Sequence, residues 1–370
     1  MTKRFATART FAFIVYALAS LDSAWAQWQT EWERVQVAAR KEGQLVVNIP
    51  PSADLRKALD DAMRQKFGIE LEIVLSDSAH TTKRVGDEFR AGVRYFDVIT
   101  STWDSLSHNL LPMGAIEPLE QFWILPEVKD PANWWGGHIW TDGAKKFSYS
   151  PYAYMLDNTW YNTSQAKAEE LRTYEDLLNP KWKGKIGLWD PRGGGGAALG
   201  IWGYLWLTKG EGFLKKLVQQ NLLLLTDRRL LAESLARGKV SIAIGATYYS
   251  YASFIKAGLP VKPLPPSKEG TFVSLGNGGP VVIKNQLHPN ATKVYVNWLL
   301  SKEGQQLYAK AFGQATRRLD VDTTWMAEIG VRAAKDNITI DNFYKWQNAL
   351  EDKDLTVRRP ALEFARKILP

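Results

Sequence analysis

The sequence predicts an α/β fold built as two units. Short apolar strands alternate with amphipathic helices in a first run over residues 27–104 and again in a second run over residues 182–251. Such alternation is typical of largely parallel sheets covered by helices. With 370 residues the chain is long enough to form two hydrophobic cores.

The first run begins close to the N-terminus. Its expected elements are a helix over 28–40, a strand over 44–49, a helix over 53–67, a strand over 69–75, a polar turn over 76–80, a helix over 81–91 and a strand over 95–99. Ser52 can cap the second of these helices and Gly68 can end it. Ligands of open α/β sheets bind at the carboxyl ends of strands. The loops after the three strands contain hydroxyl side chains. We therefore expect Ser52, Ser78 and Thr102, with the neighbouring Trp103, to contact a ligand.

The second run follows an aromatic-rich stretch, residues 134–162, which we expect to be core rather than a ligand wall. Its expected elements are a strand over 186–189, helices over 197–206 and 212–220, a strand over 221–225, a helix over 227–237, a strand over 240–245, an extended connector over 260–266, a glycine loop entering a strand over 274–283, helices over 291–300 and 303–311, and short helices from 320. No internal repeat of fixed period is present.

Residues 182–196 are the most distinctive stretch of the chain. The glycines that follow Arg192 lie between a buried strand and an apolar helix, so their backbone N–H groups and the positive helix end favour an anion. The Arg192 guanidinium would add a fork suited to carboxylate or phosphate. We therefore expect Arg192, Gly193, Gly194 and Gly195 to contact a ligand; the alternative is a flexible turn that only links strand to helix.

The N-terminus has the pattern of a secretory signal peptide. Lys3, Arg4 and Arg9 precede an apolar run, and a small-x-small site ends at Ala26. We expect cleavage after Ala26, although an ordinary N-terminal helix is the alternative. Because the chain contains no cysteine, we expect neither disulfides nor a lipid anchor, and hence a free periplasmic protein.

Composition narrows the class of partner. A hydrophobic share of 45% and a charged share of 23% are those of an ordinary globular protein, and no interior segment suits a membrane helix. The net charge of +8 is spread along the sequence, so it argues mildly for an anionic ligand and hardly at all for nucleic acid. We expect no stable membrane insertion and a monomer.

Three segments together resemble one protein family. They are WERVQVAARKEGQLVV (32–47), LNPKWKGKIG (178–187) and HPNATKVYVNWLLSKEGQ (288–305). In this order they are similar to motifs of bacterial extracellular solute-binding proteins, on the branch of type II periplasmic binding proteins that includes ferric-ion-binding receptors. The resemblance implies two α/β lobes, two hinge strands, a solute held in the central cleft, and an inner-membrane ABC permease as partner.

The resemblance also implies a division of the chain. It places the signal peptide at 1–26, the first part of lobe one at 27–146, lobe two at 147–280, and a return to lobe one at 281–335. Residues 336–370 would form C-terminal helices that pack on lobe two.

Iron is one alternative ligand. Iron-binding members of the family hold the ion with two adjacent tyrosines after a strand, and Tyr248 and Tyr249 stand at that position here. The expected first-lobe partners are absent, since residues 48–54 contain no His and residues 101–103 contain no Glu. Ferric ion would then be transported cargo, and no resident cofactor or metal is expected.

An anionic organic solute fits the candidate residues better. Hydroxyls and glycine amides suit carboxylate or phosphate oxygens, while Trp103 and the tyrosine pair can pack against a carbon skeleton. A secreted hydrolase is a remote alternative, because the sequence has no cysteine, no Gly-x-Ser-x-Gly elbow and no paired carboxylates at a fixed spacing. A sensor or scaffold that uses the same binding fold is a further alternative. We expect a receptor and not an enzyme.

Overall fold

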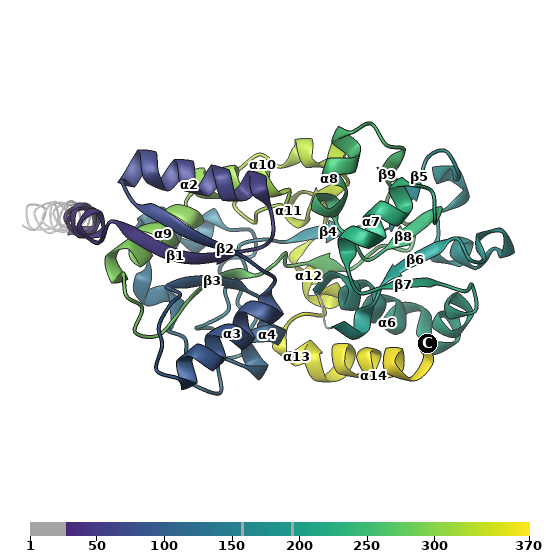
Figure 1. Cartoon of the computed structure of the whole chain (residues 1–370), viewed down its shortest axis with the longest axis horizontal. Helices are drawn as coiled ribbons and strands as arrows, with labels where there is room; N and C mark the ends of the chain where they lie inside the picture. Colours follow the sequence, from purple (N-terminus) through teal and green to yellow (C-terminus); the bar gives the residue numbers. More distant parts are fainter. Residues whose placement is uncertain (1–26, 157–158, 194–195) are drawn as a thin grey trace, which may run out of the picture.

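The computed structural model describes residues 27–156, 159–193 and 196–370. Two α/β lobes lie side by side along the long axis of the molecule (Figure 1). Purple and blue segments from the first third of the chain form most of one lobe, and teal and green segments form most of the other. The predicted two-lobed α/β fold is confirmed.

The first lobe is organised around a four-stranded sheet. Its strands are β1 (Gln44–Ile49), β2 (Glu70–Leu75), β3 (Val98–Ser101) and β11 (Gly279–Val282). The strand order is β11-β3-β1-β2; β2 and β3 run parallel to β1, whereas β11 is antiparallel to β3. The chain therefore returns to this sheet after the second lobe has formed.

Helices cover this sheet and its surroundings. They are a helix over residues 27–42, α2 (Ala53–Phe67), α3 (Ser78–Arg90), α4 (Trp103–His108), α5 (Pro126–Lys129), α9 (Pro289–Leu300) and α10 (Lys302–Phe312). As predicted, the Ser52 hydroxyl caps α2 by accepting from the Leu55 amide at 3.2 Å, and Gly68 ends the helix at φ 67°. The apolar face of α2 is buried in the core.

Helix α3 begins earlier than expected. The predicted polar turn over 76–80 is instead the first turn of α3, because the Asp77 carboxylate caps the helix and accepts from the His80 amide at 3.0 Å. The start moves from Thr81 to Ser78, and this change brings Asp77 and His80 to the end of β2.

The second lobe contains a five-stranded sheet. Its strands are β5 (Thr159–Asn162), β6 (Ile186–Trp189), β7 (Leu223–Leu225), β8 (Ile242–Ile244) and β9 (Val261–Pro263), in the order β7-β6-β8-β5-β9. β7 and β8 are parallel to β6, and β5 is antiparallel to both β8 and β9. The extended connector expected over 260–266 contains β9, which joins the sheet at its edge, where proline is tolerated.

Three helices pack on this second sheet: α6 (Gly196–Val218), α7 (Arg228–Ala236) and α8 (Tyr248–Lys256). The two helices predicted over 197–206 and 212–220 form α6, which is interrupted at Gly210 with φ 76°. The aromatic-rich stretch over 134–162 is partly core, as expected, since Trp134 and Trp160 are each 2% exposed. Tyr149 and Tyr154 are also buried, but they line the cavities described below.

A small sheet lies near the middle of the molecule. It pairs β4 (Tyr154–Leu156) with β10 (Val273–Ser274) and β12 (Val331–Ala333). The remaining helices are α11 (Ala334–Asn337), α12 (Ile340–Trp346), α13 (Glu351–Lys353), a π-helix (Asp354–Arg358) and α14 (Arg359–Ile368). Seven short 3-10 helices span Leu119–Phe122, Pro131–Asn133, Ala168–Glu170, Tyr174–Leu178, Pro180–Trp182, Pro191–Gly193 and Thr324–Ile329 among the described residues.

The C-terminal helix packs on the second lobe (Figure 1). The indole N–H of Trp202, on α6, donates to the Ala361 carbonyl of α14 at 2.9 Å.

The lobe boundaries given above remain a prediction. In the part of the chain that the structure describes, no helix has the length and apolar character needed to cross a bilayer.

Candidate ligand-binding cleft

A cavity of about 470 Å³ lies between the two lobes. First-lobe residues 77–80, which follow β2, and Thr102, Asp104 and Ser105, which follow β3, line one side. Residues 226–229, which follow β7, and Thr247 and Tyr249, which follow β8, line the other side together with Trp189 and Gly193. The cavity is thus formed where strands of both sheets end, as expected for open α/β sheets, and its volume suits a small molecule.

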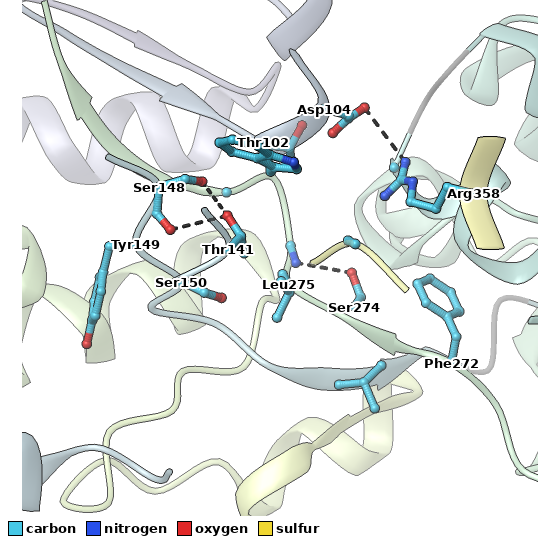
Figure 2. A pocket seen from close by; sticks show the side chains of 16 residues that line it. Thr102, Asp104, Thr141, Ser148, Tyr149, Ser150, Phe272, Ser274, Leu275 and Arg358 are labelled. Atoms are coloured by element: carbon cyan, nitrogen blue, oxygen red, sulfur yellow. Dashed lines mark hydrogen bonds and ion pairs between the residues drawn. The ribbon is translucent and has the colours of Figure 1, made fainter. Parts of the chain in front are cut away.

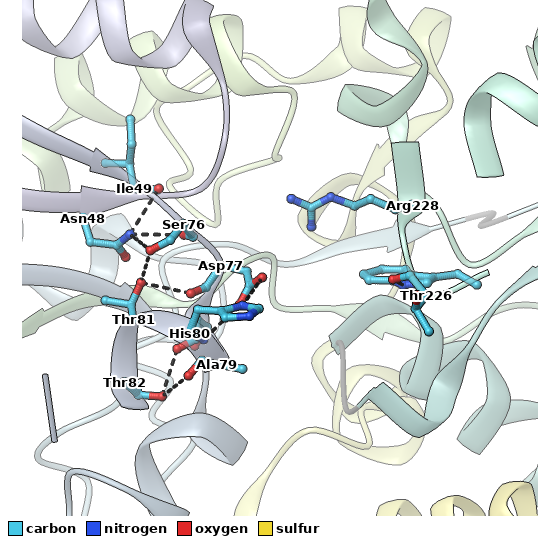
Figure 3. A network of polar contacts seen from close by, with 12 residues as sticks. Asn48, Ile49, Ser76, Asp77, Ala79, His80, Thr81, Thr82, Thr226 and Arg228 are labelled. Carbon is cyan, nitrogen blue, oxygen red and sulfur yellow. Dashed lines mark hydrogen bonds and ion pairs between the residues drawn. The ribbon is translucent and has the colours of Figure 1, made fainter. Parts of the chain in front are cut away.

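The first-lobe wall contains a tight polar network (Figure 3). The His80 ring nitrogen Nδ1 lies 2.8 and 2.9 Å from the two carboxylate oxygens of Asp77. Burial alone would raise the pKa of Asp77, but the hydrogen bonds from the His80 amide and ring, with the charge of Arg228, hold it below its ordinary value. Asp77 is therefore a carboxylate with its partners already in place.

Two hydroxyls tie neighbouring loops of this wall together. The oxygens of Ser78 and Ser101 lie 2.6 Å apart, and the Thr102 amide donates to the Ser78 hydroxyl at 3.3 Å. The first turn of α3 is thereby fixed to the end of β3. This arrangement holds Ser78 and Thr102 together at the cavity surface.

The second-lobe wall presents a guanidinium. Arg228 donates from Nη1 to the Tyr249 phenol oxygen at 3.1 Å, and its guanidinium carbon lies 4.8 Å from that ring centroid and 5.9 Å from the Trp189 ring. In Figure 3 the side chain points across the cleft toward Asp77 and His80. No ion pair joins Arg228 to a carboxylate of the described residues, so its charge faces the cavity.

Two polar groups of the cavity wall have no hydrogen-bond partner within the described part of the protein. They are the buried Thr247 hydroxyl and the amide nitrogen Nδ2 of Asn277. Buried polar groups are nearly always hydrogen-bonded, so the lack of a protein partner leaves both groups available to a ligand. The cavity wall therefore offers a ligand the positive charge of Arg228, the amide N–H groups of Asn277 and the hydroxyl of Thr247.

A second, smaller cavity of about 30 Å³ adjoins the first (Figure 2). Both cavities share Thr102, Asp104, Gly196, Ser274 and Gly276 as lining residues. The smaller cavity also contacts Ser148, Ser150 and Arg358. The two spaces are therefore neighbouring parts of one cleft.

The sequence-predicted site residues are only partly brought together. Ser78, Thr102, Gly193 and Tyr249 line the larger cavity, and Trp103 lines the smaller one. Gly194 and Gly195 lie outside the described residues. Ser52, Arg192 and Tyr248 line neither cavity.

These three residues have structural partners instead. Ser52 caps α2. Arg192 places its fork on the buried Asp190, with Nε–Oδ1 at 3.0 Å and Nη2–Oδ2 at 2.7 Å, and donates to the Pro370 carbonyl at 2.8 Å. Tyr248 packs against the hydrophobic core beside Gly313.

Sequence reasoning missed Asp77, Arg228, Thr247 and Asn277. A usable signal existed for Arg228, since Asp227 caps α7 directly after a strand and places the next side chain at the carboxyl end of β7. His80 lies at the edge of the cavity, where its ring contacts Asp77 while its side chain stays 83% exposed.

The tyrosine pair considered as an iron site is divided between two environments. Within the described ranges, no three His, Asp or Glu side chains are grouped to hold an ion. Tyr249, one of the two expected iron ligands, has its oxygen hydrogen-bonded to the Arg228 cation, and Tyr248 lines neither cavity. The positive charge of Arg228 therefore lies beside this oxygen and raises the local potential there.

Comparisons with known proteins agree with this architecture. A family model described as bacterial extracellular solute-binding protein matches residues 57–332. An uncharacterized protein of Haemophilus influenzae is 28% identical over 284 residues, which are 74% of this chain and 77% of that protein.

Solved structures show the same fold. Iron-bound HitA from Pseudomonas aeruginosa superposes with a TM-score of 0.64 at 20% identity, over 88% of this chain and 99% of that chain. AfuA from Actinobacillus pleuropneumoniae, with fructose-6-phosphate bound, gives 0.61 at 21% identity, with the same two coverages. Trichodesmium FutA, in complex with iron and citrate, gives 0.61 at 19% identity over 88% and 99%.

The match of the family model covers most of the chain, and the two-lobed architecture with a cleft between the sheets agrees with it. Proteins of this kind are non-enzymatic receptors that present a small molecule to an ABC permease from the periplasm. The chain belongs to the family of bacterial extracellular solute-binding proteins.

Proposed function

We propose that this receptor captures a small anionic solute, with a carboxylate or phosphate group, and delivers it to its permease. The observation that carries the proposal is the Arg228 guanidinium, which faces the cavity without a carboxylate partner among the described residues. An anionic ligand would stabilise the half-buried guanidinium of Arg228.

The wall opposite Arg228 supports the same class of ligand. Asp77 is already satisfied by His80, so the negative charge of this carboxylate is partly compensated. The Ser78 and Thr102 side chains and the Asn277 amide nitrogen can bind anionic oxygens, while the Trp189 ring, on the same lobe as Arg228, offers an apolar surface to the carbon skeleton.

Closure of the lobes around the solute would complete the site. The Lys256 ammonium of α8 already lies 3.1 Å from the Asp54 carboxylate of α2, so an exposed ion pair joins the two lobes. A closed cleft excludes water and strengthens the charged contacts. The permease would then distinguish the loaded receptor by its shape.

Export follows the signal peptide proposed over residues 1–26. Cleavage after Ala26 would release a free monomer into the periplasm. Mass measurement of the periplasmic protein tests this step, since a chain that starts at Gln27 is expected and a retained leader would contradict it.

Thermal unfolding in the presence of matched solutes tests the ligand class. A ligand that binds only the folded state raises the melting temperature. We expect stabilisation by a phosphorylated or carboxylated solute and none by its neutral counterpart, for example fructose 6-phosphate against fructose. Stabilisation by ferric ion alone, or equally by neutral and anionic solutes, would contradict the proposal.

A further inference from the structure

Arg358 is a buried cation that the protein leaves largely unpaired. The residue is 3% exposed and ends the π-helix Asp354–Arg358. Its Nε and Nη2 atoms have no hydrogen-bond partner in the part of the chain that the structure describes. Burying a charge without hydrogen bonds is costly, so a side chain held in this state calls for a partner.

The partner that the described residues supply is a poor one. Arg358 Nη2 lies 3.7 Å from the Asp104 Oδ2 atom, which is within ion-pair range but too far for a hydrogen bond. Figure 2 shows the two side chains pointing at each other at the smaller cavity. Asp104 belongs to α4 of the first lobe and keeps 22% of its side chain exposed, so it can turn toward water.

Arg358 and Arg228 occupy different parts of the same cleft. Arg358 lines the smaller cavity and Arg228 the larger one, and the two spaces share lining residues such as Thr102 and Ser274. A ligand in the larger cavity therefore has a short route to the Arg358 guanidinium. The shared wall includes the Ser274 hydroxyl, which can also bind anionic oxygens.

We infer that Arg358 is a second anion anchor of the cleft, and that the solute carries two anionic groups. One group binds at Arg228 and the other displaces the Asp104 carboxylate from Arg358. This inference rests on the proposed anionic solute and specifies that the solute has two anionic groups. It assigns a ligand-contacting role to a residue of the C-terminal segment.

A purely structural role would be a latch between the first lobe and the C-terminal segment. A latch built for stability would bring the guanidinium fork into hydrogen-bond contact with the carboxylate, as Arg192 does with Asp190 at 2.7 Å. The 3.7 Å separation and the two unpartnered nitrogen groups of Arg358 fit an exchangeable contact better.

Calorimetric binding of matched probes to the full mature protein tests the inference. The probes are fructose 6-phosphate against fructose 1,6-bisphosphate, and butyrate against succinate. For at least one pair, we expect the wild type to bind the member with two anionic groups at least tenfold more tightly. Arg358→Gln should remove most of this preference and change affinity for the member with one anionic group less than twofold.

Asp104→Asn provides a second variant that keeps Arg358 in place. Because it removes the competing charge, it should raise affinity for the probe with two anionic groups several-fold while Arg358→Lys lowers it. Equal affinities within both pairs for the wild type, or no gain in Asp104→Asn, would overturn the inference and leave the proposed function standing. Failure of all four probes to bind the wild type would contradict both.

Discussion

The Arg228 guanidinium donates to the Tyr249 phenol oxygen at 3.1 Å, so the first turns of α7 and α8 are joined at the cavity wall. Tyr249 is held from behind by stacking on Phe312, with ring centroids 4.8 Å apart. Phe312 in turn ends α10. The cation is therefore positioned by a chain of rigid contacts, which favours a single direction for an approaching anion.

Replacement of Arg228 by glutamine should weaken an anionic ligand most. The loss of a charged hydrogen bond costs about 1.5–3 kcal/mol, or roughly tenfold to a hundredfold in affinity. Titration calorimetry measures the change. Arg237→Gln is the matched control, because Arg237 lies at the other end of α7, is exposed and pairs with Glu233; an equal loss in both variants would contradict a specific role for Arg228.

Tyr249→Phe should have a smaller effect on the same titration. The variant keeps the stack on Phe312 but loses the acceptor of the Arg228 hydrogen bond. A neutral hydrogen bond is worth about 0.5–1.5 kcal/mol, so affinity should fall by no more than about tenfold. The variant also tests iron: a visible absorbance band that ferric ion induces in the wild type and that disappears in Tyr249→Phe would contradict the anionic assignment.

Asp190 should make stability depend on pH. Burial alone would raise the pKa of this carboxyl, but the hydrogen bonds and charge of Arg192 lower it below its ordinary value. Because the folded pKa is the lower one, the stabilisation is complete above the unfolded pKa of about 3.9 and is lost as pH falls through the folded pKa.

The melting temperature measured between pH 7 and pH 3 checks this dependence. Asp190→Asn should melt lower at pH 7 and lose less stability on acidification than the wild type. Asp352→Asn, at an exposed carboxylate of α13, should behave as the wild type. Identical acid profiles for Asp190→Asn and the wild type would refute the coupling.

Gly278 should tolerate no side chain. A Cβ atom there would lie 1.7 Å from the Ser101 carbonyl oxygen, and its φ of +87° is a conformation that side chains avoid. Gly92 has a similar φ of +77° but nothing within 4 Å, so Gly92→Ala reports the backbone cost alone, about 1–2 kcal/mol. Gly278→Ala should lower the free energy of unfolding further; equal losses in denaturant titrations would show that the close approach is unimportant.

Local signals in the sequence were sufficient for most of the first lobe. The Ser52 cap, the four-residue spacing of apolar side chains and Gly68 define α2 within the chain itself, and the structure has the same helix. The start of α3 was wrong because Asp77, and not a later residue, caps it. Edge strand β9 was predicted only as part of an extended connector, because Pro260 and Pro263 favour a connector unless the neighbouring strand is known.

The cleft was harder to predict, since its charges depend on tertiary contacts. Arg192 directly precedes the glycines that predict an anion site, yet its guanidinium donates to Asp190, which lies two residues earlier in the sequence. The Asp227 cap places Arg228 at the carboxyl end of β7, but the neighbouring Arg229 has the same charge, so the local signal does not show which arginine is held in place by Tyr249. Arg358 reaches the cleft from the C-terminal segment, and no spacing in the sequence connects it with Asp104.

Native mass spectrometry of the receptor purified from the periplasm tests the central claim most directly. A retained solute should appear as a discrete mass added to the polypeptide, should release as a phosphorylated or carboxylated small molecule, and should be absent from Arg228→Gln but present in Arg237→Gln. Retention of a neutral solute, or of ferric ion by the wild type and Arg228→Gln alike, would contradict an anion held by Arg228.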